Sequence, residues 1–133
     1  MLEKRLQQEH ELLLKFYPTA IRNGLWFLIP SYPVANDRGW NREVVNVAFQ
    51  AQANHPAAAP YGFHVPSGML CNGAKPANYT EPSQTIPPFG EAWGMFSWTL
   101  ADGVPWIPQA DLVSGANLLN FARSIGDRFR EGA

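Results

Sequence analysis

The sequence contains only one cysteine, Cys71, among its 133 residues. It also lacks an excess of either charge, because its 10 basic and 11 acidic residues give a net charge of −1. A single thiol cannot form an intramolecular disulfide, which is typical of a reducing compartment, so we expect a cytoplasmic protein. Nucleic acid is not expected as a partner, because phosphate binding needs clustered positive charge.

Long hydrophobic runs are missing as well. The most apolar run, residues 25–30 (LWFLIP), is far shorter than the roughly 20 residues that span a bilayer. Residues 1–18 carry charges throughout and have no apolar signal core, so no membrane association is expected. The three histidines and the cysteine show no close ligand spacing, and we expect no metal and no cofactor.

The composition is that of a chain that builds its own hydrophobic core. Hydrophobic residues make up 46% of the sequence and charged residues only 16%. At this length, residues 1–133 are predicted to form a single domain. The 12 prolines and 11 glycines cluster between the predicted elements, which indicates a loop-rich middle.

Hydrophobic periodicity predicts a helix at each end of the chain. The first follows an apolar stripe from Leu2 to Phe16 and ends before Pro18. The second is predicted to begin at the N-cap Asp111. Its predicted inner face consists of Leu112, Gly115, Leu119, Ala122, Ile125 and Phe129.

Between the helices the pattern predicts antiparallel strands. Strands are expected at 24–30, 42–51 and 61–65, and residues 66–90 are expected to be irregular. Alternation in the second strand places on one face Val45, Val47, Phe49 and Ala51. Residues 92–106 are predicted to form a hairpin with Asp102-Gly103 at its turn. The sequence therefore predicts an α+β fold with its helices on one side of a meander sheet.

Cys71 admits two interpretations. A free cysteine is most often a buried small hydrophobe. The surrounding segment, residues 67–73 (SGMLCNG), is however polar and glycine-rich, which favours an exposed loop and a reachable, nucleophilic thiolate. His64 or His55 could assist by pairing with the thiolate, although a histidine in an alternating strand more often points to solvent.

Four segments, in order, resemble the ubiquitin-conjugating enzyme family. The first is the N-terminal amphipathic helix followed by a strand meander. NHPAAAP resembles the family's Tyr-Pro-x-x-Pro-Pro turn, with His55-Pro56 and Pro60 in the proline positions. SGMLC resembles the Gly-x-x-Cys approach to the catalytic cysteine, and WIPQADL resembles the Trp-x-Pro segment that opens the following helix, with Trp106 and Pro108 in register.

The chain departs from this family in two places. It has no counterpart of the Asn in the family's His-Pro-Asn segment, and its stretch between Cys71 and Trp106 is longer. Both departures resemble the conjugating enzymes of bacterial ubiquitin-like conjugation operons, some of which serve in antiphage defence. The resemblance implies a UBC-like fold over the whole chain.

The resemblance further implies a mechanism. Cys71 would accept a ubiquitin-like protein from an adenylating enzyme as a thioester and pass it to an amine on a target. The partner of the oxyanion stays open among Asn72, Asn78, His64 and the backbone amides of residues 66–74. His64 and Asn72 are placed first because they lie nearest to Cys71 in sequence.

The family's N-terminal helix commonly meets the activating enzyme. The residues of this helix that are implied as contacts are Lys4, Arg5, Gln8 and Lys15. A merely solvated helix face is the alternative interpretation. Two other functions also stay open: a non-catalytic interaction scaffold of the same fold, and a thiol hydrolase in which Cys71 works with His64 or His55.

Overall fold

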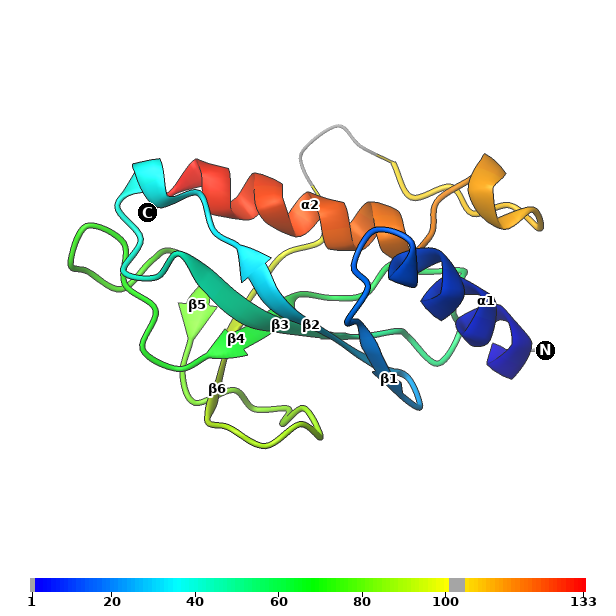
Figure 1. Ribbon diagram of the computed structural model, residues 1–133, viewed down its shortest axis with the longest axis horizontal. Helices are drawn as coiled ribbons and strands as arrows, with labels where there is room; N and C mark the ends of the chain where they lie inside the picture. The colour runs from blue at the N-terminus through cyan, green and yellow to red at the C-terminus, as the bar shows by residue number, and fades with distance from the viewer. Residues whose placement is uncertain (1, 101–104) are drawn as a thin grey trace.

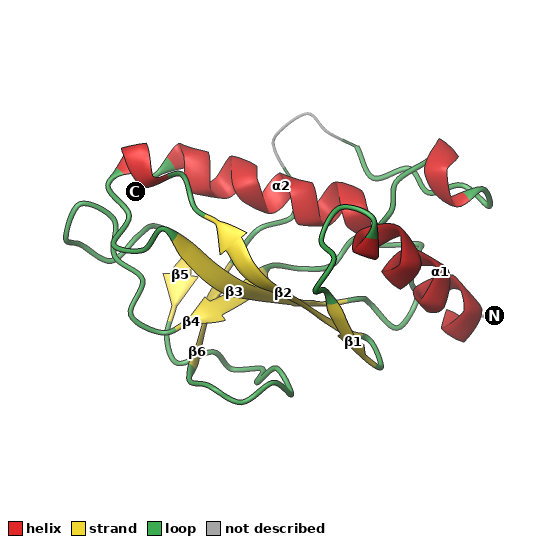
Figure 2. Ribbon diagram, in the orientation of Figure 1, coloured by secondary structure: helices red, strands yellow, loops and turns green. Residues whose placement is uncertain are grey.

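The structure, a computed structural model, describes residues 2–100 and 105–133. It contains an N-terminal helix, α1 (Leu2–Leu14), a six-stranded antiparallel sheet and a C-terminal helix, α2 (Leu118–Glu131) (Figure 1). The two helices contact each other and pack on the same side of the sheet (Figure 2). The predicted α+β class is confirmed.

The first four strands of the sheet form a meander, and the last two strands are added out of sequence order. Its strands are β1 (Ile21–Asn23), β2 (Trp26–Pro33), β3 (Val44–Gln50), β4 (Phe63–Pro66), β5 (Tyr79–Thr80) and β6 (Trp93–Phe96). They lie in the order β1-β2-β3-β4-β6-β5. The first four strands are therefore joined as consecutive neighbours, while β6 pairs with β4 and leaves the two-residue β5 at the edge.

The alternation that predicts β3 is confirmed by burial. Val45, Val47 and Phe49 are all in the main core beneath the helices. The predicted end of the preceding strand at Pro30 is wrong, because β2 continues to Pro33. A register shift between Ile29 and Tyr32 accommodates the proline, which has no N–H to give to the ladder, so Pro30 marks a bulge instead of a terminus.

Helix α2 starts later than the sequence predicts. Asp111 caps a short 3-10 turn, η2 (Leu112–Ser114), and the α-helix itself begins at Leu118. Asn117 and Asn120 form a reciprocal capping box there, which satisfies amides that an α-helix leaves free at its first turn. The predicted inner-face positions Leu119, Ala122, Ile125 and Phe129 are buried. The earlier positions Leu112 and Gly115 precede the helix, so their assignment to it is wrong.

The stretch after β4 is more ordered than the sequence predicts. Strand β5 lies within residues 66–90, which were expected to be irregular. The first arm of the predicted 92–106 hairpin exists as β6, but its partners are β4 and β5. The proposed turn at Asp102-Gly103 falls outside the described residues. Two extra strands thus extend the sheet beyond the meander.

Glu9 joins three separate parts of the fold. Its carboxylate is fully buried on α1 and accepts hydrogen bonds from the Leu118 amide (2.5 Å), at the start of α2, and from Arg5 Nε (2.9 Å). It also pairs with Nε2 of His55, in the turn between β3 and β4. Burial opposes ionisation of Glu9, but the bonds from His55, Leu118 and Arg5 outweigh it and lower its pKa.

Candidate active site at Cys71

Cys71 lies in the loop that follows β4, and this loop is clamped by the segment that connects β2 to β3. Across this contact the Asn41 amide donates to Leu70 O (3.0 Å) and the Asn72 amide donates to Gly39 O (2.8 Å). The Asn41 side chain receives a further bond from the Leu70 amide (2.9 Å). Cys71 itself pairs with Ala74 in a tight turn. The loop is therefore a defined structure, although its sequence is rich in turn residues.

The Cys71 side chain is buried, with 1% of its surface exposed. Its sulfur donates to Arg38 O at 3.1 Å. Gly132, just after α2, is a near neighbour of the sulfur, because a Cβ placed on that glycine would lie 3.9 Å from Sγ. The prediction of a reachable thiol is wrong for this conformation. Residues distant in sequence, Arg38 and Gly132, lie beside the buried sulfur.

Arg128 is the charged group built into this part of the core. Its guanidinium is 2% exposed and lies over the ring of Phe96, 4.7 Å from the centroid. It donates to Gly132 O and to Ala77 O, both at 2.7 Å, and no carboxylate among the described residues lies within ion-pair distance of it. Burial lowers its pKa, while the nearby Glu131 and Cys71 act in the opposite direction.

The structure does not bring His64 and Cys71 together. Phe63 and Val65, the neighbours of His64 on β4, belong to the same core cluster as Cys71. Successive side chains of a strand point to opposite faces, so His64 faces the other side of the sheet. There its ring packs edge-on against Trp26, with the centroids 5.2 Å apart. Burial lowers the pKa of His64 to about 4, so the ring is neutral at pH 7.

Asn72 is the predicted site residue that does stay beside the thiol. It is exposed, and its backbone adopts a positive φ of 53°. Its side chain lies against Gly39, where a Cβ would fall 1.9 Å from Oδ1, so only glycine fits at that position. The backbone amide of Asn72 donates to Gly39 O and that of Cys71 to Ala74 O, so the side-chain amide is the donor that remains on the residue following Cys71.

Of the other predicted residues, some are exposed and some are used inside the fold. His55 is buried in the pair with Glu9 and is not available to Cys71. Lys4 and Gln8 are exposed on α1, as a docking face requires, whereas Lys15 is exposed but follows the end of the helix, so its placement on the helix is wrong. Arg5 instead reaches inward to Glu9 and to Gln109 O (2.9 Å), so it holds the fold together and is not a free contact.

Three residues near Cys71 were missed by the sequence analysis: Arg38, Arg128 and Gly132. Arg38 acts through its backbone carbonyl, which carries no sequence signal. Arg128, by contrast, follows Ile125 by three positions and Phe121 by seven, so helical periodicity could have placed it on the buried face. Gly132 directly follows the helix, where a glycine commonly terminates it.

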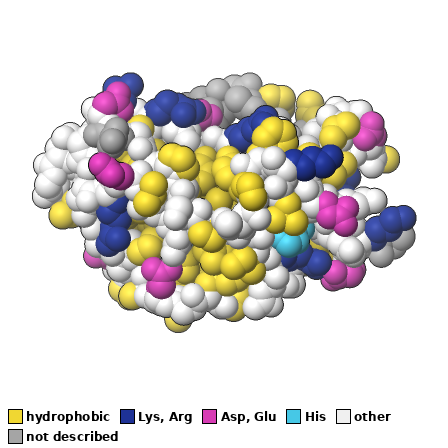
Figure 3. Space-filling model, in the orientation of Figure 1, with side chains coloured by type: hydrophobic (Ala, Val, Ile, Leu, Met, Phe, Trp, Pro, Cys, Tyr) yellow, Lys and Arg dark blue, Asp and Glu magenta, His cyan; other side chains and the backbone are white. Residues whose placement is uncertain are grey.

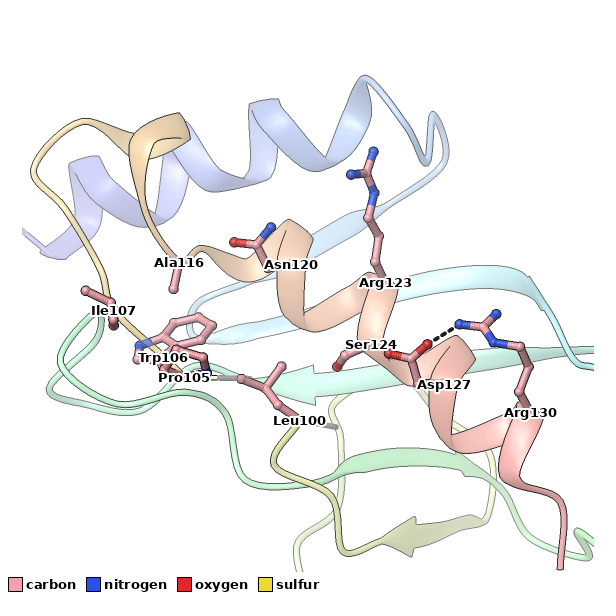
Figure 4. Close-up of a pocket in the computed structure, with 10 residues that line it drawn as sticks. All are labelled: Leu100, Pro105, Trp106, Ile107, Ala116, Asn120, Arg123, Ser124, Asp127 and Arg130. Atoms are coloured by element: carbon pink, nitrogen blue, oxygen red, sulfur yellow. Dashed lines mark hydrogen bonds and ion pairs between the residues drawn. The ribbon is translucent and has the colours of Figure 1, made fainter. Parts of the chain in front are cut away.

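A cavity of about 500 Å³ lies apart from Cys71, between α2 and the segment that precedes it. Figure 4 shows its apolar wall, which includes Trp106 and Ile107, facing the polar side chains of α2, among them Arg123 and the paired Asp127 and Arg130. Hydrophobic side chains also gather across the middle of the face seen in Figure 3. None of the predicted catalytic residues lines this cavity, so Cys71 and the cavity are separate features.

The described residues include no cluster of three or more side chains that could hold a metal ion. No helix in the described ranges is both long enough and apolar enough to cross a membrane. Comparisons with protein-family models, with curated proteins and with solved structures give no match for this chain. These comparisons assign no family.

Proposed function

We propose that this chain is a ubiquitin-conjugating-like domain with a UBC-like fold, which carries a ubiquitin-like protein as a thioester on Cys71 and transfers it to an amine on a target. The observation that carries the proposal is the placement of two of the segments that resemble the family. The indole N–H of Trp106 donates to Pro56 O at 2.8 Å, so the Trp-x-Pro segment packs on the His-Pro turn between β3 and β4.

Further support comes from the order of the elements. The helix α1, the β1 to β4 meander, the cysteine loop and α2 follow one another as in the resemblance. The stretch between Cys71 and Trp106, whose length resembles that of the bacterial conjugating enzymes, contains β5 and β6. We therefore propose a role in a bacterial antiviral defence system, with an adenylating enzyme and a ubiquitin-like protein as partners.

The chemistry proposed for Cys71 is acyl transfer. The thiolate attacks the activated C-terminal carboxyl group, a sulfur–carbon bond forms, the activating group leaves, and the thiol proton passes to solvent. An amine of the target then attacks the thioester carbon: a nitrogen–carbon bond forms, the sulfur–carbon bond breaks, and the amine proton passes through solvent to the released thiolate. The Asn72 side chain is the proposed oxyanion donor, because it is exposed beside Cys71 whereas His64 faces the other side of the sheet.

A second candidate function is a non-catalytic interaction scaffold of the same fold. The burial of Cys71 and its bond to Arg38 O favour this candidate, since a buried thiol packs as a small hydrophobe and is inert. In that case the exposed side of α1 would still bind the partner protein. A Cys-His hydrolase is not proposed, because neither His64 nor His55 lies with Cys71.

A charging assay distinguishes the two candidates. The protein is mixed with ATP and with the proposed partners, a bacterial ubiquitin-like protein and its adenylating enzyme, and the products are separated with and without thiol reductant. We expect a reductant-sensitive adduct on the wild type, none on Cys71→Ala, and a reductant-stable ester or none on Cys71→Ser. A folded protein that forms no adduct with an active adenylating enzyme would support the scaffold.

The contact of Trp106 with Pro56 can be tested by stability. We expect Trp106→Phe to lower the free energy of unfolding by about 1 kcal/mol more than a Trp→Phe change that only shortens the aromatic side chain, because one hydrogen bond is also lost. Urea unfolding measures the change. Trp26→Phe is the control, since no hydrogen bond to the Trp26 indole is found among the described residues. Equal losses in both variants would contradict the assignment.

A further inference from the structure

Two residues from distant parts of the chain lie next to the sulfur of Cys71, Arg38 and Gly132. The Arg38 carbonyl accepts from Sγ, and a Cβ on Gly132 would lie 3.7 Å from Arg38 Cβ as well as 3.9 Å from Sγ. Gly132 is buried even though it lies outside α2. Its backbone therefore lies buried beside both Arg38 and the thiol, at the end of α2.

Gly132 is held in place by its backbone alone. Its amide donates to Phe129 O (3.2 Å), and its carbonyl accepts from Arg128 Nη1 (2.7 Å). Its φ of 78° and ψ of −132° lie in a region that only glycine occupies without strain. The second terminal nitrogen of Arg128, Nη2, donates to Ala77 O, so the guanidinium links the end of α2 to the segment before β5. We call this link the latch.

A helix end held in this way opens far more easily than the whole domain unfolds. Helix termini and the residues beyond them fray at a small fraction of the global free energy, because few buried contacts are lost. Phe129, the residue that anchors this end, stays fixed by its contact with the Trp40 ring and by the bond from Trp40 Nε1 to its carbonyl (2.8 Å). The hinge therefore lies between Phe129 and Gly132.

We propose that the end of α2 is a hinged cover for Cys71, latched by Arg128, and that its opening controls when the thiol reacts. The consequence for acyl transfer rests on the proposed function, but the cover itself does not. Arg128 is a positioning residue in this device, since it acts on the thiol through Gly132. A partner protein that displaces Gly132 would expose Cys71 and switch the site on.

Alkylation of Cys71 by iodoacetamide tests the cover without any partner. In this reaction a sulfur–carbon bond forms, iodide leaves and the thiol proton passes to solvent. We expect the wild type to react at least about tenfold more slowly than N-acetylcysteine at the same pH. The rate should not change at low urea concentrations, because a local opening exposes little surface, whereas global unfolding would follow the slope of the equilibrium transition.

Gly132→Ala is the deciding variant. A methyl group at this φ and ψ strains the closed backbone, and we expect alkylation to become about tenfold faster with no loss of the folded spectrum. Gly24→Ala is the matched control, since Gly24 also has a positive φ (62°), has open space around it and lies in the β1–β2 turn. It should react at the wild-type rate.

Arg128→Lys provides a second measurement that does not depend on the glycine. Lysine keeps the charge, but its single nitrogen cannot reproduce the two-pronged hydrogen bonding of the guanidinium to Gly132 O and Ala77 O. Gly132 would then be held less firmly, and alkylation should become severalfold faster. The cover is overturned if both variants react at the wild-type rate, if Gly24→Ala accelerates as much as Gly132→Ala, or if the wild-type rate follows the global urea slope. If Gly132→Ala does not fold, Arg128→Lys and the wild-type urea slope decide the question.

The alkylation and charging experiments can fail independently. Faster alkylation of Gly132→Ala together with no adduct in the charging assay would support the proposed cover and contradict the acyl-carrier function. A wild-type protein that forms the thioester but whose Cys71 is alkylated as fast as N-acetylcysteine would support the acyl-carrier function and contradict the proposed cover. If both proposals hold, Gly132→Ala should also form the thioester faster than the wild type.

Discussion

Replacement of Glu9 by alanine is expected to cost about 3–5 kcal/mol in the free energy of unfolding, because it breaks a buried charge cluster by removing one member. The loss leaves the His55 ring and the Leu118 amide buried without their partner. It also removes a carboxylate from the N-terminus of α2, where a negative charge is favourable. Urea unfolding at pH 7 measures the change.

Glu11→Ala is the matched control for this prediction. Glu11 lies on the same helix but is exposed, so its loss should change the free energy by no more than about 0.5 kcal/mol. Losses of similar size in the two variants would contradict the role assigned to Glu9. Because the pKa of Glu9 is lowered by folding, its contribution is present above the usual carboxyl pKa and is lost as the pH falls through the folded value.

The Glu9 cluster also shows where sequence reasoning stops. The apolar stripe predicts the existence of α1, although the helix ends at Leu14 and Phe16 is exposed beyond it. Glu9 falls on the buried side of the helix, but the stripe does not say which groups meet its carboxylate. His55 and Leu118 are 46 and 109 residues away in the chain. Local periodicity carries no information about such contacts, because they depend on how the turn after β3 and the start of α2 are brought to α1.

The same limit explains the outcome at Cys71. The polar, glycine-rich segment around it correctly predicts a loop, but a loop is exposed only if no other part of the chain covers it. The Arg38 carbonyl lies 33 residues away, and Gly132 reaches the sulfur from the end of α2. Strong periodicity, in contrast, predicts β3 and the inner face of α2 well, since burial of those residues follows from the elements themselves.

Short elements were missed for a different reason. β1 has three residues and β5 has two, so neither is long enough to show alternation. Both gain their regular structure from pairing with longer strands, β2 and β6. Helix α2 starts late because the chain offers two good N-cap residues, Asp111 and Asn117. Only Asn117 forms a reciprocal capping box, with Asn120, and the α-helix begins after it.

The wild-type protein should lose about 2 kcal/mol of stability between pH 7 and pH 5, and His64 is the expected cause. Burial lowers its pKa from 6.5 to about 4 in the folded protein. Between these values the unfolded chain binds a proton that the folded protein does not, so the free energy of unfolding falls as the pH falls. The effect is small above the unfolded pKa and reaches its full size only below the folded pKa of about 4.

His64→Phe tests this origin, because it fills a similar volume next to Trp26 and cannot be protonated. We expect urea unfolding at pH 7 and pH 5 to differ by about 2 kcal/mol less in this variant than in the wild type. Met95→Leu, at the position paired with His64 on β6, should keep the wild-type difference. An unchanged pH dependence in His64→Phe would contradict the assignment to His64.

The same variant separates a packing role of His64 from the catalytic role that the sequence suggests. Because His64 and Cys71 face opposite sides of the sheet, His64→Phe should form and discharge the Cys71 thioester at the wild-type rate at pH 7. Asn72→Ala, beside the thiol, should keep charging but slow the transfer to amines by 10²- to 10³-fold, the effect of removing one oxyanion donor. A slow His64→Phe and a fast Asn72→Ala would reverse the two roles.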